Sequence, residues 1–277
     1  EWFPVKERAL ASGIFNSGSS IGAIVSAPLV AWIVLRFGWQ ASFWAIGAIG
    51  MAWLAIWFAV YRTPPRMERE VQAPPIPALR LLRTQWVWRF TVSKIFSDPV
   101  WYFYIFWFPQ YLRTAHGFDL QSIGRLAWIP FATAGAGNVI GGWTFEALLK
   151  RGVEAQRAKK MCVWIFAFFM TAAIPSVLTP NVYVSIALIS MATMGYTGGL
   201  ASMLSMPADV FPKNAVGSIW GLASMGAGFG GMVFSLVTGW VVDHYSYTPV
   251  FFGFGLIPLL AAAIVWRLPE RVQELES

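Results

Sequence analysis

Two oppositely charged residues stand inside an otherwise apolar stretch of this 277-residue chain. Lys94 and Asp98 are four residues apart, so on a helix they share one face. A charge placed in hydrocarbon costs ~2.5–3.5 kcal/mol on insertion scales, and ionisable residues within membrane segments therefore default to function. The spacing predicts a coupling carboxylate or ion-pair partner at Asp98 and a Lys94 ammonium that binds an anion. The alternative is an ion pair whose only role is structural.

Two aromatic residues extend the same helix face. Trp101 and Tyr102 follow Lys94 at i+7 and i+8, where a ring could stack on an organic substrate or hydrogen-bond to it. We therefore predict both as substrate-binding residues. Uncharged polar side chains in other apolar stretches are further candidates, although each could equally form a helix–helix hydrogen bond worth ~0.6–2 kcal/mol. These candidates are Asn16, Ser19 and Ser224.

The elements that must position these residues are membrane-spanning helices. Residues 161–208 contain no Asp, Glu, Lys or Arg in 48 positions, which is long enough for two crossings of ~20 residues each. Similar runs recur along the chain, and the composition is 57% hydrophobic and only 12% charged. The pattern predicts an all-α, polytopic membrane helix bundle with eight spans, at about 8–36, 39–61, 88–111, 121–149, 161–178, 181–206, 214–242 and 247–266.

The predicted topology explains the net charge of +7, because the basic residues gather on one side of the membrane. If the connections alternate between the two sides, 16 Lys and Arg residues fall on one side and three on the other. An excess of Lys and Arg marks the cytoplasmic side. We therefore expect a multi-pass protein of the cell inner membrane, with both termini of this chain cytoplasmic, the lipid bilayer as its surroundings and no nucleic acid as partner.

The spans divide into unequal groups. Residues 1–61 hold two spans, residues 62–87 form a cytoplasmic linker rich in Arg and Pro, residues 88–266 hold six spans, and residues 267–277 form a cytoplasmic tail. The order suggests a six-plus-six transporter whose first half lacks four helices in this chain. Gly-x-x-x-Gly pairs predict close helix packing. They are Gly18/Gly22, Gly137/Gly141, Gly195/Gly199, Gly217/Gly221 and Gly226/Gly230.

Three segments resemble a known family. Residues 1–19 resemble the junction of helices 4 and 5 in the anion:cation symporters of the major facilitator superfamily, and residues 94–112 resemble helix 7 of their hexuronate transporters. Residues 141–152 are similar to the superfamily's loop motif, with Gly142, Glu146 and Arg151 as its members and Glu146 where the motif usually has Asp.

The resemblance implies a major-facilitator-type bundle comprising helices 5–12 of a 12-helix fold. It also implies proton-coupled symport of an organic anion, a sugar acid such as glucuronate or galacturonate, by a full-length protein that is monomeric. Lys94, Ser19 and Ser224 fall where relatives place polar substrate contacts. The coupling carboxylates of relatives lie upstream of Glu1, so we expect this chain alone to be inactive.

Two other functions compete with symport. An exchanger of organophosphates or sugar phosphates would need several cations in the cavity, and a non-transporting membrane sensor would need an additional cytoplasmic domain. The sequence contains no metal-ligand cluster, nucleotide-binding loop or catalytic triad, so we expect neither an enzyme nor a cofactor. The identity of the sugar acid is left open.

Overall fold

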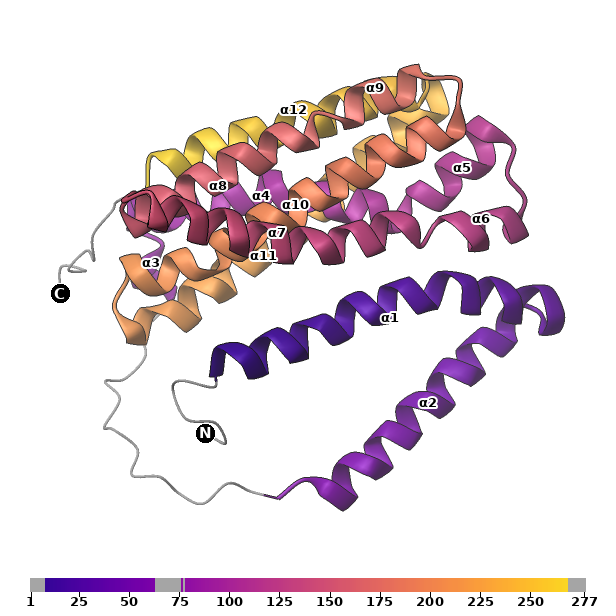
Figure 1. Cartoon of the computed structure of the whole chain (residues 1–277), viewed down its shortest axis with the longest axis horizontal. Helices are drawn as coiled ribbons and strands as arrows, with labels where there is room; N and C mark the ends of the chain where they lie inside the picture. Colours follow the sequence, from indigo (N-terminus) through magenta and orange to yellow (C-terminus); the bar gives the residue numbers. More distant parts are fainter. Residues whose placement is uncertain (1–7, 63–75, 77, 269–277) are drawn as a thin grey trace. The chain divides into compact units, whose positions relative to one another are not determined.

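Every regular element that the structure describes is an α-helix (Figure 1). The computed structural model describes residues 8–62, 76 and 78–268. The predicted all-α class is confirmed within these residues. Residues 1–7 of the N-terminal motif, most of the predicted linker and residues 269–277 of the tail lie outside them. The helices are α1 (Arg8–Phe37), α2 (Trp39–Val60), α3 (Ala78–Leu81), α4 (Gln85–Phe106), α5 (Phe108–His116), α6 (Leu120–Leu126), α7 (Ile129–Lys150), α8 (Ala155–Met170), α9 (Ala173–Leu178), α10 (Val182–Val210), α11 (Lys213–His244) and α12 (Tyr247–Trp266).

Three of the eight predicted spans are each built from two helices. The breaks separate α4 from α5, α6 from α7, and α8 from α9, and each break lies two to four residues before a proline: Pro109, Pro130 and Pro175. A proline clashes with the carbonyl four residues earlier and lacks an N–H, so it is tolerated in the first turn of a helix and interrupts the turn before it. Other prolines, including Pro99 in α4 and Pro258 in α12, remain inside their helices.

The turns between helices carry the expected local chemistry. Gly38 joins α1 to α2 with a φ of 83°, a left-handed conformation that favours glycine. The Asp119 side chain accepts a hydrogen bond from the Ser122 N–H at 2.9 Å and caps α6. The Ser122 side chain, and then its backbone N–H, hold the pKa of that carboxyl below its ordinary value. Asn181 caps α10 in the same way. Such caps satisfy N–H groups at the first turn, which have no intrahelical partner.

The chain divides into two compact units. The first comprises residues 1–72 and 112–128, and within it α1 packs on α2 and α6. Large apolar side chains of α2 are exposed in this unit, among them Trp44 (81%) and Phe58 (75%). A helix that is apolar on all sides is suited to lipid or to burial in a helix bundle. The predicted domain boundaries are not tested by this division and remain predictions.

The second unit comprises residues 73–111 and 129–277 and is a helix bundle. In it α10 packs on α7 and α8 (Figure 1), and α4 packs on α11 and α12. A cluster of buried apolar side chains joins α4, α8, α10, α11 and α12, with Phe90, Met206, Ile219 and Val265 among its members. This unit carries the candidate site.

Close packing at glycine is confirmed for three of the predicted pairs. A Cβ at Gly137 or Gly141 would collide with α10. A Cβ at Gly195 would collide with the Phe166 carbonyl of α8, and a Cβ at Gly230 would lie 2.5 Å from the Ile95 carbonyl of α4. By contrast, a Cβ at Gly217 or Gly221 would meet no atom within 4 Å. The bundle therefore uses glycine where helix backbones cross at short range.

Five helical segments among the described residues are long and apolar enough to cross a membrane. They are Trp39–Val60, Ala155–Leu178, Val182–Val210, Asn214–His244 and Tyr247–Trp266. The α4 helix is not among them, and its sequence carries Arg89, Lys94 and Asp98. Two of these three charged residues, Lys94 and Asp98, are the ones that the sequence marks as functional.

Candidate functional site

Lys94 and Asp98 form an ion pair inside the second unit. The Nζ atom of Lys94 donates to Oδ1 of Asp98 at 2.7 Å, and the two side chains are only 5% and 13% exposed. The other two ion pairs between described side chains, Lys150–Glu146 and Lys159–Asp209, are both more exposed. The predicted i,i+4 contact is therefore present, and it is the most enclosed charge pair in the described part of the chain.

Tyr196 of α10 completes the polar centre. Its hydroxyl donates to the same Asp98 oxygen at 3.2 Å, so that Oδ1 accepts two hydrogen bonds. The tyrosine is buried, with 7% of its surface exposed. Sequence reasoning missed Tyr196. The available signal was weak: it is one of two tyrosines in the charge-free run 161–208, and it lies directly beside Gly195.

Aromatic rings surround the ion pair. Trp101 stacks on Tyr196 with ring centroids 5.2 Å apart and planes inclined by 8°. Phe131 of α7 meets Trp101 edge-on at 6.0 Å. The Lys94 ammonium lies 5.8 Å from the ring centroid of Trp220 on α11, within the range of a cation–π contact. The site thus combines one buried charge pair with aromatic surface from four helices.

Glycines of α11 bring that helix against α4. A Cβ at Gly226 would lie 2.7 Å from Thr91, and one at Gly230 would lie 2.5 Å from the Ile95 carbonyl. These contacts lie beside Lys94, so the helix–helix crossing fixes the backbone that carries the ammonium. Since any side chain would separate the helices, the crossing depends on glycine at these positions.

The remaining predicted residues lie at different places. Tyr102 packs against Gly231 of α11, where an added Cβ would lie 2.6 Å from its ring, and stacks on Phe106. Ser224 is exposed on α11, one helical turn after Trp220. The side chains of Asn16 and Ser19 lie outside the described residues, although their backbone belongs to α1. Substrate contact by these four residues remains a prediction.

The loop-motif residues lie at the end of α7. Glu146 accepts from Lys150 at 2.8 Å along the helix, and both side chains are more than half exposed. Gly142 and Arg151 are also exposed. The described residues show no ion pair between Glu146 and Arg151, and the motif's network therefore remains a prediction.

The arrangement can bind an anion by exchange. Lys94 has three N–H donors, of which Asp98 takes one, and an arriving carboxylate can use the others or replace Asp98. The Trp101–Tyr196 stack offers a flat apolar face beside the ammonium. Within the described residues, no group of three His, Cys, Asp or Glu side chains could hold a metal ion.

Comparison with known proteins gives a consistent result across the chain. The sequence profile of the Major Facilitator Superfamily matches residues 1–154 and 152–277. The hexuronate transporter of Escherichia coli strain K12 is 29% identical over 296 aligned positions, covering 100% of this chain and 68% of that protein. The galacturonate transporter of Dickeya chrysanthemi is 31% identical over 215 positions, covering 70% of this chain and 62% of that protein. The chain thus spans about two thirds of the length of these relatives.

Solved structures with the same fold are more distant in sequence. A bacterial homologue of the human lysosomal transporter Spinster, in an inward-facing and occupied conformation, is 18% identical with a TM-score of 0.65. The match covers 98% of this chain and 73% of the Spinster homologue. This similarity shows the fold alone, and it confirms the predicted major-facilitator-type bundle.

Proposed function

The chain belongs to the major facilitator superfamily, and on that premise we propose that it contains the C-terminal six-helix half of a secondary active transporter together with two helices of the N-terminal half. The substrate is a sugar acid of the hexuronate class, taken up across the inner membrane together with protons. The names of the relatives support this class, since they include hexuronate and galacturonate transporters. The observation that carries the proposal is the buried Lys94–Asp98 pair beside the Trp101–Tyr196 stack.

Binding follows from the chemistry of the site. A hexuronate has one carboxylate and one pyranose ring. The carboxylate binds the Lys94 ammonium, while the apolar face of the ring packs on Trp101. Two negative groups then compete for one ammonium, and a carboxylate left without its counter-charge in a buried site is costly. The substrate carboxylate therefore displaces Asp98 from the ammonium, and the Tyr196 hydroxyl remains as a donor to the Asp98 oxygen.

The competing transport function is less well supported by the described residues. A sugar phosphate carries about two negative charges, and its recognition requires several cations. Within the described part of the second unit, Lys94 is the one cation near this site, and it is already paired with Asp98. A single paired ammonium matches a monocarboxylate better than a phosphate.

The proposed orientation places both ends of this chain in the cytoplasm. It can be tested by single-cysteine labelling in a Cys162→Ser background. A cysteine at Glu154 should react with an impermeant maleimide only after the membrane is opened, and a cysteine at His116 should react in intact cells. The reverse pattern would contradict the orientation.

Uptake measurements test the function directly. The protein is expressed from its natural gene in cells that lack hexuronate transport, and uptake of radiolabelled glucuronate and galacturonate is followed with and without a proton uncoupler. We expect saturable uptake that the uncoupler abolishes and that excess unlabelled hexuronate inhibits. Uptake of glucose 6-phosphate in exchange for phosphate would instead support the exchanger, and uncoupler-resistant accumulation would contradict proton coupling.

A further inference from the structure

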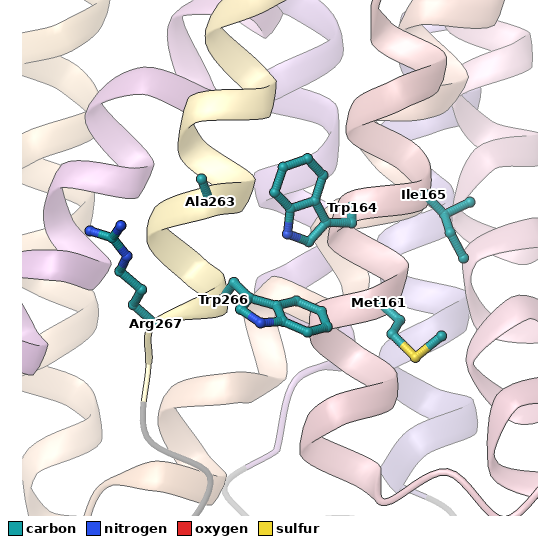
Figure 2. Close-up of a pocket in the computed structure, with 6 residues that line it drawn as sticks. All are labelled: Met161, Trp164, Ile165, Ala263, Trp266 and Arg267. Carbon is teal, nitrogen blue, oxygen red and sulfur yellow. The ribbon is translucent and has the colours of Figure 1, made fainter.

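A groove lies between α8 and α12, away from the Lys94 site. It has a volume of about 570 Å³, within the ~300–1,000 Å³ range typical of small-molecule sites. Figure 2 shows the six residues that line it: Met161, Trp164, Ile165, Ala263, Trp266 and Arg267. Five of the six are apolar or aromatic, and all come from two helices of the same unit.

In the orientation proposed above, the groove lies toward the cytoplasmic interface of the membrane. Trp266 is the last residue of α12, and Trp164 lies four residues after Lys160, or about 6 Å along the helix axis at ~1.5 Å per residue. Tryptophan is enriched at this depth, where its ring lies in the apolar region and its N–H reaches polar groups. Figure 2 shows the two indoles one above the other between α12 and α8.

Both indoles are partly exposed and can donate a hydrogen bond to a ligand. Trp164 and Trp266 are 37% and 42% exposed. Among the described residues, neither indole N–H donates to a protein acceptor, whereas those of Trp88, Trp107 and Trp128 do. Two indole N–H donors therefore lie at a groove whose other lining residues, apart from Arg267, are apolar. An ester or phosphate oxygen above an acyl chain requires such an environment.

Positive charge gathers at the cytoplasmic end of the groove. Arg157 precedes Met161 by four residues and so lies one turn closer to the cytoplasm on the same face of α8, and it is exposed. Arg267 directly follows α12 as its C-cap and is also exposed, its side chain directed away from the indoles in Figure 2. No carboxylate of the described residues forms an ion pair with either arginine, and the acidic residue nearest along α8 is Glu154 at its N-cap.

Two further cations reinforce this end of α12. A guanidinium N–H of Arg89 donates to the Arg267 carbonyl at 3.1 Å, and the buried Lys160 ammonium donates to the Leu268 carbonyl at 2.6 Å. Since both side chains are held by backbone carbonyls, their charges stay at this place. Two cationic side chains are thus hydrogen-bonded to the end of α12 beside Arg267.

From these observations we infer that the groove binds one anionic phospholipid of the cytoplasmic leaflet. An acyl chain lies along Met161, Ile165 and Ala263, the indoles donate to the glycerol ester and phosphate oxygens, and Arg157 binds the phosphate. Arg267 joins it when its side chain, which is directed away from the indoles in Figure 2, turns toward the groove. Long arginine side chains reach toward the headgroup layer readily, and the anionic leaflet surface attracts such basic residues. The apolar lining favours a lipid over a free phosphate, which has no chain to fill it.

Native mass spectrometry of the purified, delipidated protein tests the inference. The protein is titrated with dioleoylphosphatidylglycerol and, separately, with dioleoylphosphatidylcholine. We expect the first phosphatidylglycerol to bind at least tenfold more tightly than phosphatidylcholine. Arg157→Gln combined with Arg267→Gln should remove this preference, because the phosphate then loses both exposed cations.

Control variants separate the groove from general surface charge. Arg80→Gln with Arg83→Gln removes the same charge from the exposed cytoplasmic surface outside the groove and should leave the preference intact. Ala263→Phe fills the groove without changing its charge, and it should weaken the binding of both lipids at least fivefold. Circular dichroism and melting of each variant establish folding, and Ala263→Leu replaces Ala263→Phe if the latter does not fold.

Several outcomes would overturn the inference. They are equal binding of the two lipids, equal loss of preference in the Arg80/Arg83 control, and binding that filling the groove does not change. Displacement of phosphatidylglycerol by an equal concentration of sn-glycerol 1-phosphate would identify a site for a free phosphate rather than a lipid.

Discussion

Replacing Lys94 by Met separates substrate binding from structural pairing. The Lys94 side chain is 5% exposed and lies 2.7 Å from Asp98, so the variant leaves a buried carboxylate with the Tyr196 hydroxyl as its remaining donor. Breaking a buried ion pair costs about 3–5 kcal/mol. Because Tyr196 still donates to Asp98, we expect a loss of stability near the lower end of this range, and a reduced amount of folded protein.

The loss of transport is expected from weaker substrate binding and is estimated separately from the loss of stability. A substrate carboxylate that loses its buried cationic partner loses about 2–5 kcal/mol of binding. At about 1.4 kcal/mol per tenfold change, this is a decrease of roughly 30- to 4,000-fold in uptake below saturation. Uptake is measured at low glucuronate concentration and divided by the amount of folded transporter, determined by fluorescence-detected size exclusion.

The double variant Lys94→Met/Asp98→Asn decides between the two roles. It removes both charges and keeps an acceptor for Tyr196, so we expect the amount of folded protein to recover. If Lys94 binds the substrate, uptake per folded molecule stays at least 30-fold below the parent. Uptake per molecule near the parent value in the double variant would refute our reasoning, since Lys94 would then serve only to neutralise Asp98.

Three further variants test other parts of the structure. Trp101→Ala should raise the KM for glucuronate about two- to tenfold, since a stacking contact is worth about 0.5–1.5 kcal/mol, while Trp101→Phe should keep most of the affinity in the same uptake assay. Gly141→Ala should destabilise the bundle by about 1–3 kcal/mol, because the new Cβ meets the Gly198 carbonyl. Gly142→Ala, which meets nothing within 4 Å, is its control in thermal unfolding, and equal melting temperatures would contradict the packing argument. Asp209→Asn leaves the buried Lys159 without its carboxylate. We expect the free energy of unfolding to fall by about 1–2 kcal/mol, less than for a fully buried pair because Asp209 is 39% exposed. Lys159→Met in addition should restore the melting temperature, and a double variant as unstable as the single one would contradict this.

The sequence alone determined the helical membrane class and the positions of the helices. A charge-free run such as 161–208 has one stable solution in lipid, because backbone N–H and C=O groups must pair within the segment. The i,i+4 contact of Lys94 with Asp98 was also predictable, since helix geometry fixes it once α4 is assigned. These inferences depend on local periodicity and on the cost of charge in hydrocarbon, and both can be read from one segment at a time.

The interrupted spans were only partly predictable. Pro99 and Pro109 lie ten residues apart in the same predicted span, yet the helix continues through Pro99 and breaks before Pro109. Inside one continuous helix, either proline would cost one backbone hydrogen bond. Whether the helix then bends or stops depends on how neighbouring helices pack around the freed carbonyl, which the sequence of the segment does not contain.

The partners of the ion pair were decided by the tertiary structure. Tyr196 is 98 residues from Asp98 in sequence, and it reaches the carboxylate because α10 packs beside α4 in the bundle. The same holds for Trp220, which meets Lys94 because Gly226 and Gly230 let α11 approach α4 closely. A sequence shows which residues can hydrogen-bond or stack. Which of them meet is set by helix–helix packing, since that packing depends on surfaces from separate segments fitting together at once.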